Sequence, residues 1–360
     1  MPAPQPQRRQ FLLGTAAAML GATALGWGCR QAPGNAPAAS APAAGSASSA
    51  GTVSDPRTVT DFRGKTITLQ APAQRVVCLL ESALSGIYML GAQDRLMGVP
   101  ANVYTGDVAP HYASLDPRLA AKSIETPGNW DFTSLEKVIA LKPDVVIQWS
   151  QQREGIAALE ARGIPVYGVF IASMADLEKE INDLAILTGA EARAQALLAY
   201  TQSVVQDIGQ RTSAIPQTQW PRVYYAWGQG MLETACRGSM VDDMIRLAGG
   251  INTCTEQIEH GKPSLESVLQ WNPEVIVLWP SERRTVESVL ADAQWRNVAA
   301  IRNRRVYPLP EVFFSDLWTL KYQFALQLMA HWFHPTVFGQ MPDAKLRAGI
   351  MGKLYGSQPL

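Results

Sequence analysis

Residues 134–149 read SLEKVIALKPDVVIQW, and residues 264–279 read SLESVLQWNPEVIVLW. The two stretches lie 130 residues apart and are identical at seven of sixteen positions without a gap. Each contains a serine suited to a helix N-cap, a short helix pattern, a proline that stops the helix, a buried-strand pattern and a final tryptophan. Because all these features keep the same register, we infer two copies of one helix–strand unit.

The regions around the repeat alternate short apolar runs with longer amphipathic stretches. Strands are expected at 76–80, 96–99, 164–170, 222–227 and 305–309, helices at 85–90 and 240–248, and a hairpin at 57–69. Between the two copies, helical periodicity continues from Met174 to about Arg211, with a break predicted at Gly189. The pattern predicts an α/β fold of two Rossmann-like lobes joined by a long helix, with a ligand cleft between the lobes.

The composition of the two ends completes the predicted order of parts. We expect an export signal at 1–29, a disordered tether at 30–56, an N-terminal lobe at 57–173, a connecting helical segment at 174–212, a C-terminal lobe at 213–338 and a C-terminal tail at 339–360. The tether is almost wholly Ala, Pro, Ser and Gly, a composition that buries too little apolar surface to fold.

The first residues have the features of an export signal. Arg8 and Arg9 precede an apolar run at 11–27, and the pair resembles a twin-arginine signal. Residues 25–29 read LGWGC and resemble a lipobox, in which Cys29 is lipidated and becomes the new N-terminus; cleavage and release is the alternative. We therefore expect an exported protein of the periplasm or cell envelope, tethered to a membrane as a lipoprotein.

Charge and motifs exclude several function classes. The chain has 31 basic and 31 acidic residues, so no basic excess favours nucleic acid or an anionic membrane surface. The usual catalytic motifs for hydrolases, metalloproteases, P-loop enzymes and dinucleotide-binding enzymes are missing, and the four histidines are scattered at 111, 260, 331 and 334. The sequence thus predicts a binding protein without catalytic activity, cofactor or metal site of its own.

The cysteines exclude a disulfide framework. Beyond Cys29 only Cys78, Cys236 and Cys254 remain, which is an odd number. A bridge between Cys236 and Cys254 is compatible with an oxidising compartment, and the alternative of free thiols stays open. Cys78 lies within an apolar strand pattern and is expected to be a small buried hydrophobe.

Aromatic residues gather where a ligand cleft is expected. Ligands of parallel α/β sheets bind beyond the carboxyl ends of the strands, and several tryptophans follow those ends. Each aromatic ring alone could equally belong to a core, but the group predicts a broad, flat-walled pocket. Glu81 and Ser82 follow the first strand, and Arg237 precedes a helix start, where it would suit an anion. The candidate ligand-binding residues are Glu81, Ser82, Trp130, Trp149, Trp227, Arg237, His260, Trp279, Phe314 and Trp318.

Several motifs resemble the class III periplasmic binding proteins of iron-siderophore and cobalamin ABC importers. They are residues 73–99, NWDFTSLE at 129–136, ALKPDVVI at 140–147, and GSMVDD at 238–243 through AGG at 248–250. The resemblance covers about residues 57–335. It implies a monomer with two lobes joined by a rigid helix, which binds a small-molecule metal chelate and docks onto ABC permease subunits.

The same resemblance implies a docking role for two glutamates. In that family an acidic residue on each lobe pairs with arginines of the permease, and the matching positions are Glu136 and Glu266. A glutamate in the first turn of a helix is favoured by the helix dipole and is usually exposed. The alternative is that the two residues only complete capping boxes with Ser134 and Ser264.

The resemblance leaves the ligand open. A ferric siderophore is expected, with a corrinoid or a molybdate-type oxyanion as alternatives within the same fold. A ligand-sensing lobe without transport is the alternative of another class. The segment 311–318 lacks the proline-rich entry expected before the family's final helix, so an unusual pocket wall is expected in the C-terminal lobe.

Overall fold

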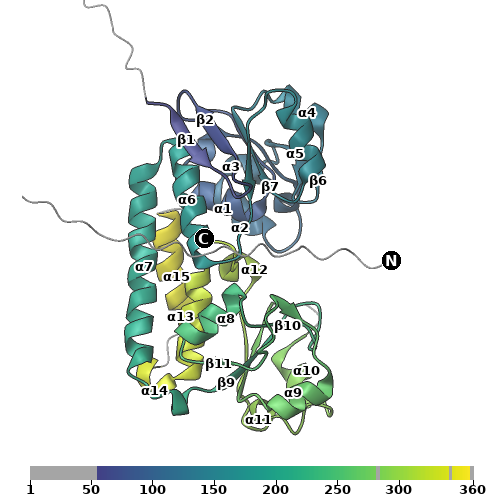
Figure 1. The fold of residues 1–360 in the computed structure, drawn as a ribbon, viewed down its shortest axis with the longest axis vertical. Coiled ribbons are helices and arrows are strands. Elements are labelled where there is room, and N and C mark those ends of the chain that lie inside the picture. Colours follow the sequence, from purple (N-terminus) through teal and green to yellow (C-terminus); the bar gives the residue numbers. More distant parts are fainter. Residues whose placement is uncertain (1–54, 281–283, 340–342, 357–360) are drawn as a thin grey trace, which may run out of the picture. The chain divides into compact units, whose positions relative to one another are not determined.

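The computed structural model describes residues 55–280, 284–339 and 343–356. The chain divides into two units, Met1–Thr52 and Val53–Leu360, and all of the described residues belong to the second (Figure 1). The predicted export signal, Cys29 and nearly all of the predicted tether lie outside the described residues.

The N-terminal lobe contains a six-stranded, mostly parallel sheet with strand order β6-β5-β4-β3-β7-β8. Only β6 is antiparallel to its neighbour. The predicted hairpin at 57–69 is confirmed and forms a separate two-stranded sheet. The elements of this lobe are β1 (Arg57–Thr60), β2 (Thr66–Leu69), β3 (Val76–Cys78), α1 (Glu81–Met89), η1 (Gln93–Arg95), β4 (Leu96–Pro100), η2 (Ala101–Tyr104), α2 (Ala109–Leu115), α3 (Pro117–Ala120), β5 (Glu125–Asn129), β6 (Phe132–Thr133), α4 (Leu135–Ala140), β7 (Val145–Trp149), α5 (Arg153–Glu160) and β8 (Val166–Val169).

The C-terminal lobe contains a second sheet with order β12-β10-β9-β13-β14, and β11 also pairs with β9. Strands β9, β11, β13 and β14 are parallel, whereas β10 is antiparallel to β9 and β12. Its elements are η3 (Gln217–Gln219), β9 (Arg222–Ala226), β10 (Thr234–Ala235), α8 (Met240–Leu247), β11 (Ile251–Asn252), β12 (His260–Gly261), α9 (Leu265–Trp271), β13 (Val275–Leu278), α10 (Val286–Ala291), α11 (Ala299–Arg302), β14 (Val306–Pro308), α12 (Val312–Ser315), α13 (Tyr322–Phe333) and α14 (Pro335–Phe338). The predicted two-lobed α/β fold is confirmed.

Two helices link the lobes, α6 (Met174–Thr188) and α7 (Glu191–Ser213). The predicted break at Gly189 is confirmed, since this residue ends α6 in the left-handed conformation with φ 70°. Glycine adopts that conformation without the steric cost of a side chain. Helix α6 packs against α1 and β1 of the N-terminal lobe, while α7 packs against α8 and α13 (Figure 1).

The central strands are buried on both faces. Their side chains point alternately into two different apolar cores. Val223 and Tyr225 of β9 belong to the large core that includes α6, α7 and α13, whereas Tyr224 and Ala226 belong to a smaller core with α9 and α10. The N-terminal sheet behaves in the same way, with a small core under α4 and α5. This alternation follows from the two-residue period of a strand, and it explains why both copies of the repeat carry continuous apolar runs.

Two predicted helix starts differ from the structure. Helix α1 begins at Glu81, not at Ser85, so Glu81 and Ser82 lie in its first turn and not in a loop. An acidic residue in this position is favoured by the helix dipole. The serine of the first repeat copy does not cap: Ser134 precedes α4 without a side-chain bond, whereas the Ser264 hydroxyl accepts a hydrogen bond from the Ser267 backbone N–H.

The segment predicted as a C-terminal tail contains a helix, α15 (Asp343–Tyr355), which packs against α13 and also against α1. Its last residues are anchored on the N-terminal lobe and the connecting helix. The Tyr355 hydroxyl lies 2.5 Å from that of Ser85 on α1, and Arg193 of α7 donates to the Leu354 carbonyl at 2.8 Å. Helix α15 therefore ties together elements from both lobes.

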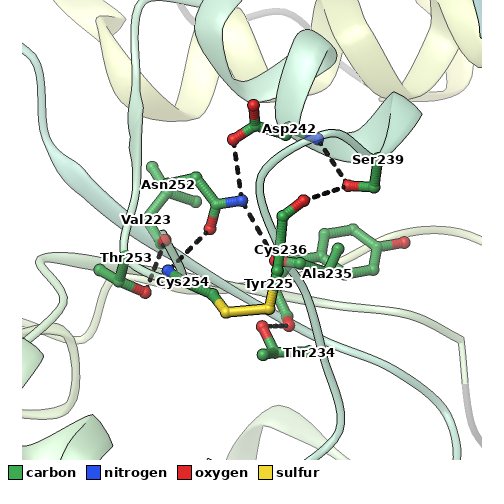
Figure 2. Close-up of a disulfide and its surroundings, with 10 residues drawn as sticks. All are labelled: Val223, Tyr225, Thr234, Ala235, Cys236, Ser239, Asp242, Asn252, Thr253 and Cys254. Atoms are coloured by element: carbon green, nitrogen blue, oxygen red, sulfur yellow. Dashed lines mark hydrogen bonds between the residues drawn. A yellow bond between two sulfur atoms is a disulfide. The ribbon is translucent and has the colours of Figure 1, made fainter. Parts of the chain in front are cut away.

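Cys236 and Cys254 form a disulfide with a Cα–Cα distance of 4.7 Å (Figure 2). The bond joins the end of β10 to the segment after β11. Asn252 supports it by donating to the Ala235 carbonyl at 3.1 Å and to the Asp242 carboxylate at 3.0 Å (Figure 2). Cys78 is buried as predicted, and burial raises the pKa of its thiol.

Glu180 on α6 is a buried acid with a strongly shifted proton affinity. Its side chain is 1% exposed, and its Oε1 atom has no hydrogen-bond partner. Burial raises the pKa of Glu180 to about 8, and the nearby carboxylates of Asp316 and Asp183 act in the same direction. The carboxyl group is therefore mostly protonated at neutral pH.

Replacing both bridge cysteines, Cys236→Ser with Cys254→Ser, is expected to lower the free energy of unfolding by about 3 kcal/mol, because the bond closes a loop of this length in the unfolded chain. Urea unfolding followed by circular dichroism measures this difference. Wild-type protein treated with reductant serves as the control and should shift in the same direction. An unchanged midpoint would contradict a structural role of the bond.

The Glu180→Gln variant is expected to lose less folding stability than the wild type as the pH rises, because glutamine cannot ionise. Because the folded pKa lies above the ordinary value of 4.5, this group's contribution to stability is complete below about pH 4.5 and is lost as the pH rises through about 8. Between about pH 6 and pH 9 the wild-type melting temperature should fall by roughly 3 °C or more relative to the variant. If the melting temperatures of the wild type and the variant change equally with pH, the buried, protonated state of Glu180 is refuted.

Candidate functional site

A cavity of about 720 Å³ lies between the two lobes. Residues from the carboxyl ends of β3, β7, β8 and β13 line it, together with the segment that contains α12. Four tryptophans and three acidic residues dominate its lining: Trp130, Trp149, Trp279, Trp318, Glu81, Glu259 and Asp316. The position matches the strand-end location at which ligands of such sheets bind.

Each lobe contributes one pair of tryptophans to the cavity. In the N-terminal lobe, Trp130 and Trp149 pack edge to face with centroids 5.6 Å apart. In the C-terminal lobe, Trp279 and Trp318 pack edge to face at 5.9 Å. Trp149 and Trp279 are the final residues of the two repeat copies, so the repeat supplies one equivalent ring from each lobe to the lining of one cavity.

Six of the ten predicted ligand-binding residues line the cavity: Glu81, Ser82, Trp130, Trp149, Trp279 and Trp318. Trp227 does not. It is 8% exposed and lies behind the C-terminal pair, stacked against Trp318 with centroids 6.1 Å apart. His260 is also displaced from the lining, because its ring stacks on Trp227 at 5.9 Å and its Nε2 atom lies 2.7 Å from Glu233.

Arg237 and Phe314 also lie outside the cavity lining. Arg237 is exposed next to the disulfide, where its backbone N–H donates to the Cys254 carbonyl at 3.1 Å. Phe314 is buried against His111, with ring centroids 4.6 Å apart. Neither residue is therefore among those that line the cavity.

The carboxylates of Glu81 and Asp316, which we call the cavity floor, are held by specific neighbours. Tyr112 donates a hydrogen bond to Glu81 Oε1 at 2.7 Å. The Trp318 backbone N–H donates to Asp316 Oδ1 at 3.0 Å, whereas Asp316 Oδ2 has no hydrogen-bond partner although the residue is only 5% exposed. An unpaired buried carboxylate oxygen is costly in free energy.

Lys321 is fully buried and does not line the cavity. Its ammonium lies 4.2 Å from the centre of the Phe313 ring. Burial lowers the pKa of Lys321, but the Tyr355 oxygen and the carboxylates of Asp316 and Glu81 outweigh this effect, so the net pKa is raised. Lys321 is thus a cation at neutral pH.

Burial acts on the pKa of Asp316 in the opposite direction to its effect on Lys321, because it disfavours the charged form of each group. Burial raises the pKa of Asp316 to about 6; the Lys321 cation opposes this rise, and Glu81 adds to it. The carboxyl group is therefore mostly ionised at neutral pH and mostly protonated near pH 5. Sequence reasoning missed Asp316, although the residue lies within the segment 311–318 that was recognised as unusual. Asn102 and Glu259 were also missed, because isolated polar loop residues carry no motif.

Glu136 and Glu266 lie outside the cavity on the surfaces of the two lobes. Both are exposed in the first turns of α4 and α9, which Figure 1 shows on the side away from α7. The pKa of Glu266 is lowered by hydrogen bonds from its own backbone N–H and from the Ser264 side chain. Neither helix forms a complete capping box.

Two kinds of feature are absent from the described residues. Within 55–280, 284–339 and 343–356, no helix has the length and apolar character of a membrane span. In the same ranges, no cluster of three or more His, Cys, Asp or Glu side chains is arranged to hold a metal ion.

Comparison with known proteins gives consistent matches. A family model described as periplasmic binding protein matches residues 76–312. The molybdate-binding protein MolA of Haemophilus influenzae is 25% identical over 298 residues, covering 77% of this chain and 83% of that protein. A vitamin B12-binding protein of Vibrio cholerae is 25% identical over 247 residues, covering 66% and 81%.

The fold is also similar to that of a periplasmic solute-binding protein from Veillonella parvula. The TM-score is 0.71 at 23% identity, with 85% of this chain and 94% of that chain covered. The family match spans more than half of the chain, and the two-lobed fold agrees with it. The chain therefore belongs to the periplasmic binding protein family, in the class III group of substrate-binding proteins that serve ABC importers.

Proposed function

We propose that this protein binds a metal chelate outside the cytoplasm and delivers it to the permease subunits of an ABC importer. The observation that best supports this proposal is the cavity between two pairs of tryptophans, one from each lobe. A ligand that contacts both pairs is bound by both lobes at once. Its presence can therefore be recognised by a permease that contacts the two lobes together.

The cavity suits a large organic ligand better than a small ion. Its volume of about 720 Å³ falls within the range of roughly 300–1,000 Å³ that encloses whole small molecules. Tryptophan rings pack well against flat, extended surfaces. A molybdate-type oxyanion would instead need cationic or N–H donors, and Arg237, which was expected to supply them, does not line the cavity. These features favour a chelate over an oxyanion.

Within the chelates, a ferric siderophore is the first proposed ligand and a corrinoid is the second. The tryptophan rings suit a planar corrin and a catecholate siderophore equally, and a vitamin B12-binding protein is among the relatives of this chain. We further propose export by the twin-arginine route and attachment to a membrane through lipid on Cys29. Both proposals rest on the sequence of residues 1–29.

We propose Glu136 and Glu266 as the docking pair for the permease. The two residues occupy matching positions in the repeat, both are exposed, and both carry a negative charge in a helix first turn. Opposite charges across an interface guide association and fix its orientation more than they add affinity. A pair of permease arginines would suit this arrangement.

Charge reversal at both positions, Glu136→Arg with Glu266→Arg, is expected to reduce uptake at least about tenfold while leaving ligand affinity unchanged, because neither residue lines the cavity. Uptake is measured in cells that carry the importer, with the probe that binds best among ferric siderophores, cobalamin and molybdate. Calorimetric titration of the purified variant measures its affinity for the same probe.

A matched control exists in the same chain. Glu154 and Glu287 are also exposed in helix first turns, on α5 and α10 of the two lobes, and their reversal to arginine should leave uptake intact. Unchanged uptake after reversal of Glu136 and Glu266 would contradict the docking proposal and favour a sensing lobe without transport.

A further inference from the structure

We propose that the cavity selects ligands that carry a positive charge, through the carboxylates of Glu81 and Asp316 and the surrounding tryptophan rings. This inference rests on the proposed binding function and adds the charge class of the ligand. It applies to a cationic chelate, or to a chelate with a pendant ammonium group, and it disfavours anionic chelates and oxyanions.

The charged groups of the lining all have the same sign. Among the described residues that line the cavity, Glu81, Glu259 and Asp316 are charged, and none is a lysine or an arginine. Desolvated charges of one sign at the base of a cleft concentrate ions of the opposite sign, since the surrounding low-dielectric walls focus the field. The cavity is therefore attractive to cations and repulsive to anions.

The buried lysine does not cancel this effect. Lys321 supplies one positive charge beneath the floor, whereas Glu81 and Asp316 supply two carboxylates. Its ammonium lies over the Phe313 ring at 4.2 Å, and Asp316 Oδ2 keeps no hydrogen-bond partner. The two carboxylates outnumber the single ammonium, so a net negative charge remains next to the cavity.

The floor is held firmly in place, as a selective site requires. Glu81 receives the Tyr112 hydrogen bond and lies in the first turn of α1. The same helix is fixed from the other side by α15, through the 2.5 Å contact between Tyr355 and Ser85. Preorganised carboxylates bind a cation without the cost of ordering flexible side chains.

The tryptophan pairs provide the second part of the recognition. A cation above an aromatic face is attracted by the negative face of the ring, and tryptophan gives the strongest effect. Four tryptophans line the same cavity as the carboxylates. The rings and the carboxylates therefore act in the same direction, and both favour a cationic ligand.

Matched pairs of probes that differ in charge and otherwise only by one small group test the inference in the full chain. The first pair is ferrioxamine B, which has a free ammonium group, and its N-acetylated form, which is neutral. The second pair is aquacyanocobinamide, a cation, and neutral dicyanocobinamide. In whichever pair binds, calorimetric titration should show the cationic member bound about tenfold more tightly.

Two variants connect this preference to the floor. Glu81→Gln keeps an acceptor for Tyr112 but removes the charge, so the cationic preference should fall to about threefold or less. Asp316→Asn removes the second carboxylate of the lining, so the preference should fall in this variant as well. Asp207→Asn on α7, an exposed acid away from the lining, is the control and should leave it unchanged.

The outcomes separate this inference from the function on which it rests. Equal affinity within a pair, tighter binding of the neutral member, or an unchanged preference in Glu81→Gln contradicts charge selection but leaves chelate binding intact. If no chelate binds, or only molybdate binds, both proposals fail. If Asp316→Asn does not fold, the conservative Glu81→Gln variant tests the inference alone.

Discussion

One apolar core extends from the N-terminal sheet and α1, past α6 and α7, to α8, α13 and the second sheet. Its members include Val76 of β3, Leu184 of α6, Leu197 of α7 and Val275 of β13. Interiors packed in this way resist deformation, because moving one element creates voids or overlaps around its neighbours. The core therefore keeps the two lobes at a defined separation, and the cavity is the space that this separation leaves.

The functional geometry depends on this constraint. The two tryptophan pairs come from segments far apart in the sequence, and they can act on one ligand only if the lobes are held at the right distance. Helix α15 strengthens the same connection, since it contacts α13 of the C-terminal lobe and α1 of the N-terminal lobe. A preformed cavity of this kind predicts small changes on binding and little loss of conformational entropy.

The repeat made the fold predictable, while the detailed site depended on tertiary packing. Continuous apolar runs such as Val145–Trp149 and Val275–Leu278 mark strands buried on both faces, and Gly189 marks the break between α6 and α7. Trp149 and Trp279 could be placed near the cleft because they end the strands of the repeat. Their neighbours could not be sorted in the same way.

The sequence cannot distinguish a tryptophan that lines a cavity from one that supports it. Trp227 and Trp279 both follow central strands of the second sheet, yet Trp279 lines the cavity and Trp227 stacks behind Trp318. Asp316 is a single acid within an aromatic segment, and only the fold reveals that it lies in the cavity with an unpaired oxygen. Arg237 looked suited to an anion, but the disulfide keeps its backbone beside Cys254 and outside the lining.

The central claim is that a metal chelate is bound between the two tryptophan pairs. A crystal of the protein with a bound chelate, measured at the absorption edge of the metal, locates that metal directly by anomalous diffraction. The account predicts one strong peak inside the cavity, between Trp149 and Trp279 and above the floor formed by Glu81 and Asp316. A metal located on the outer surface of either lobe, with the cavity empty, would contradict it.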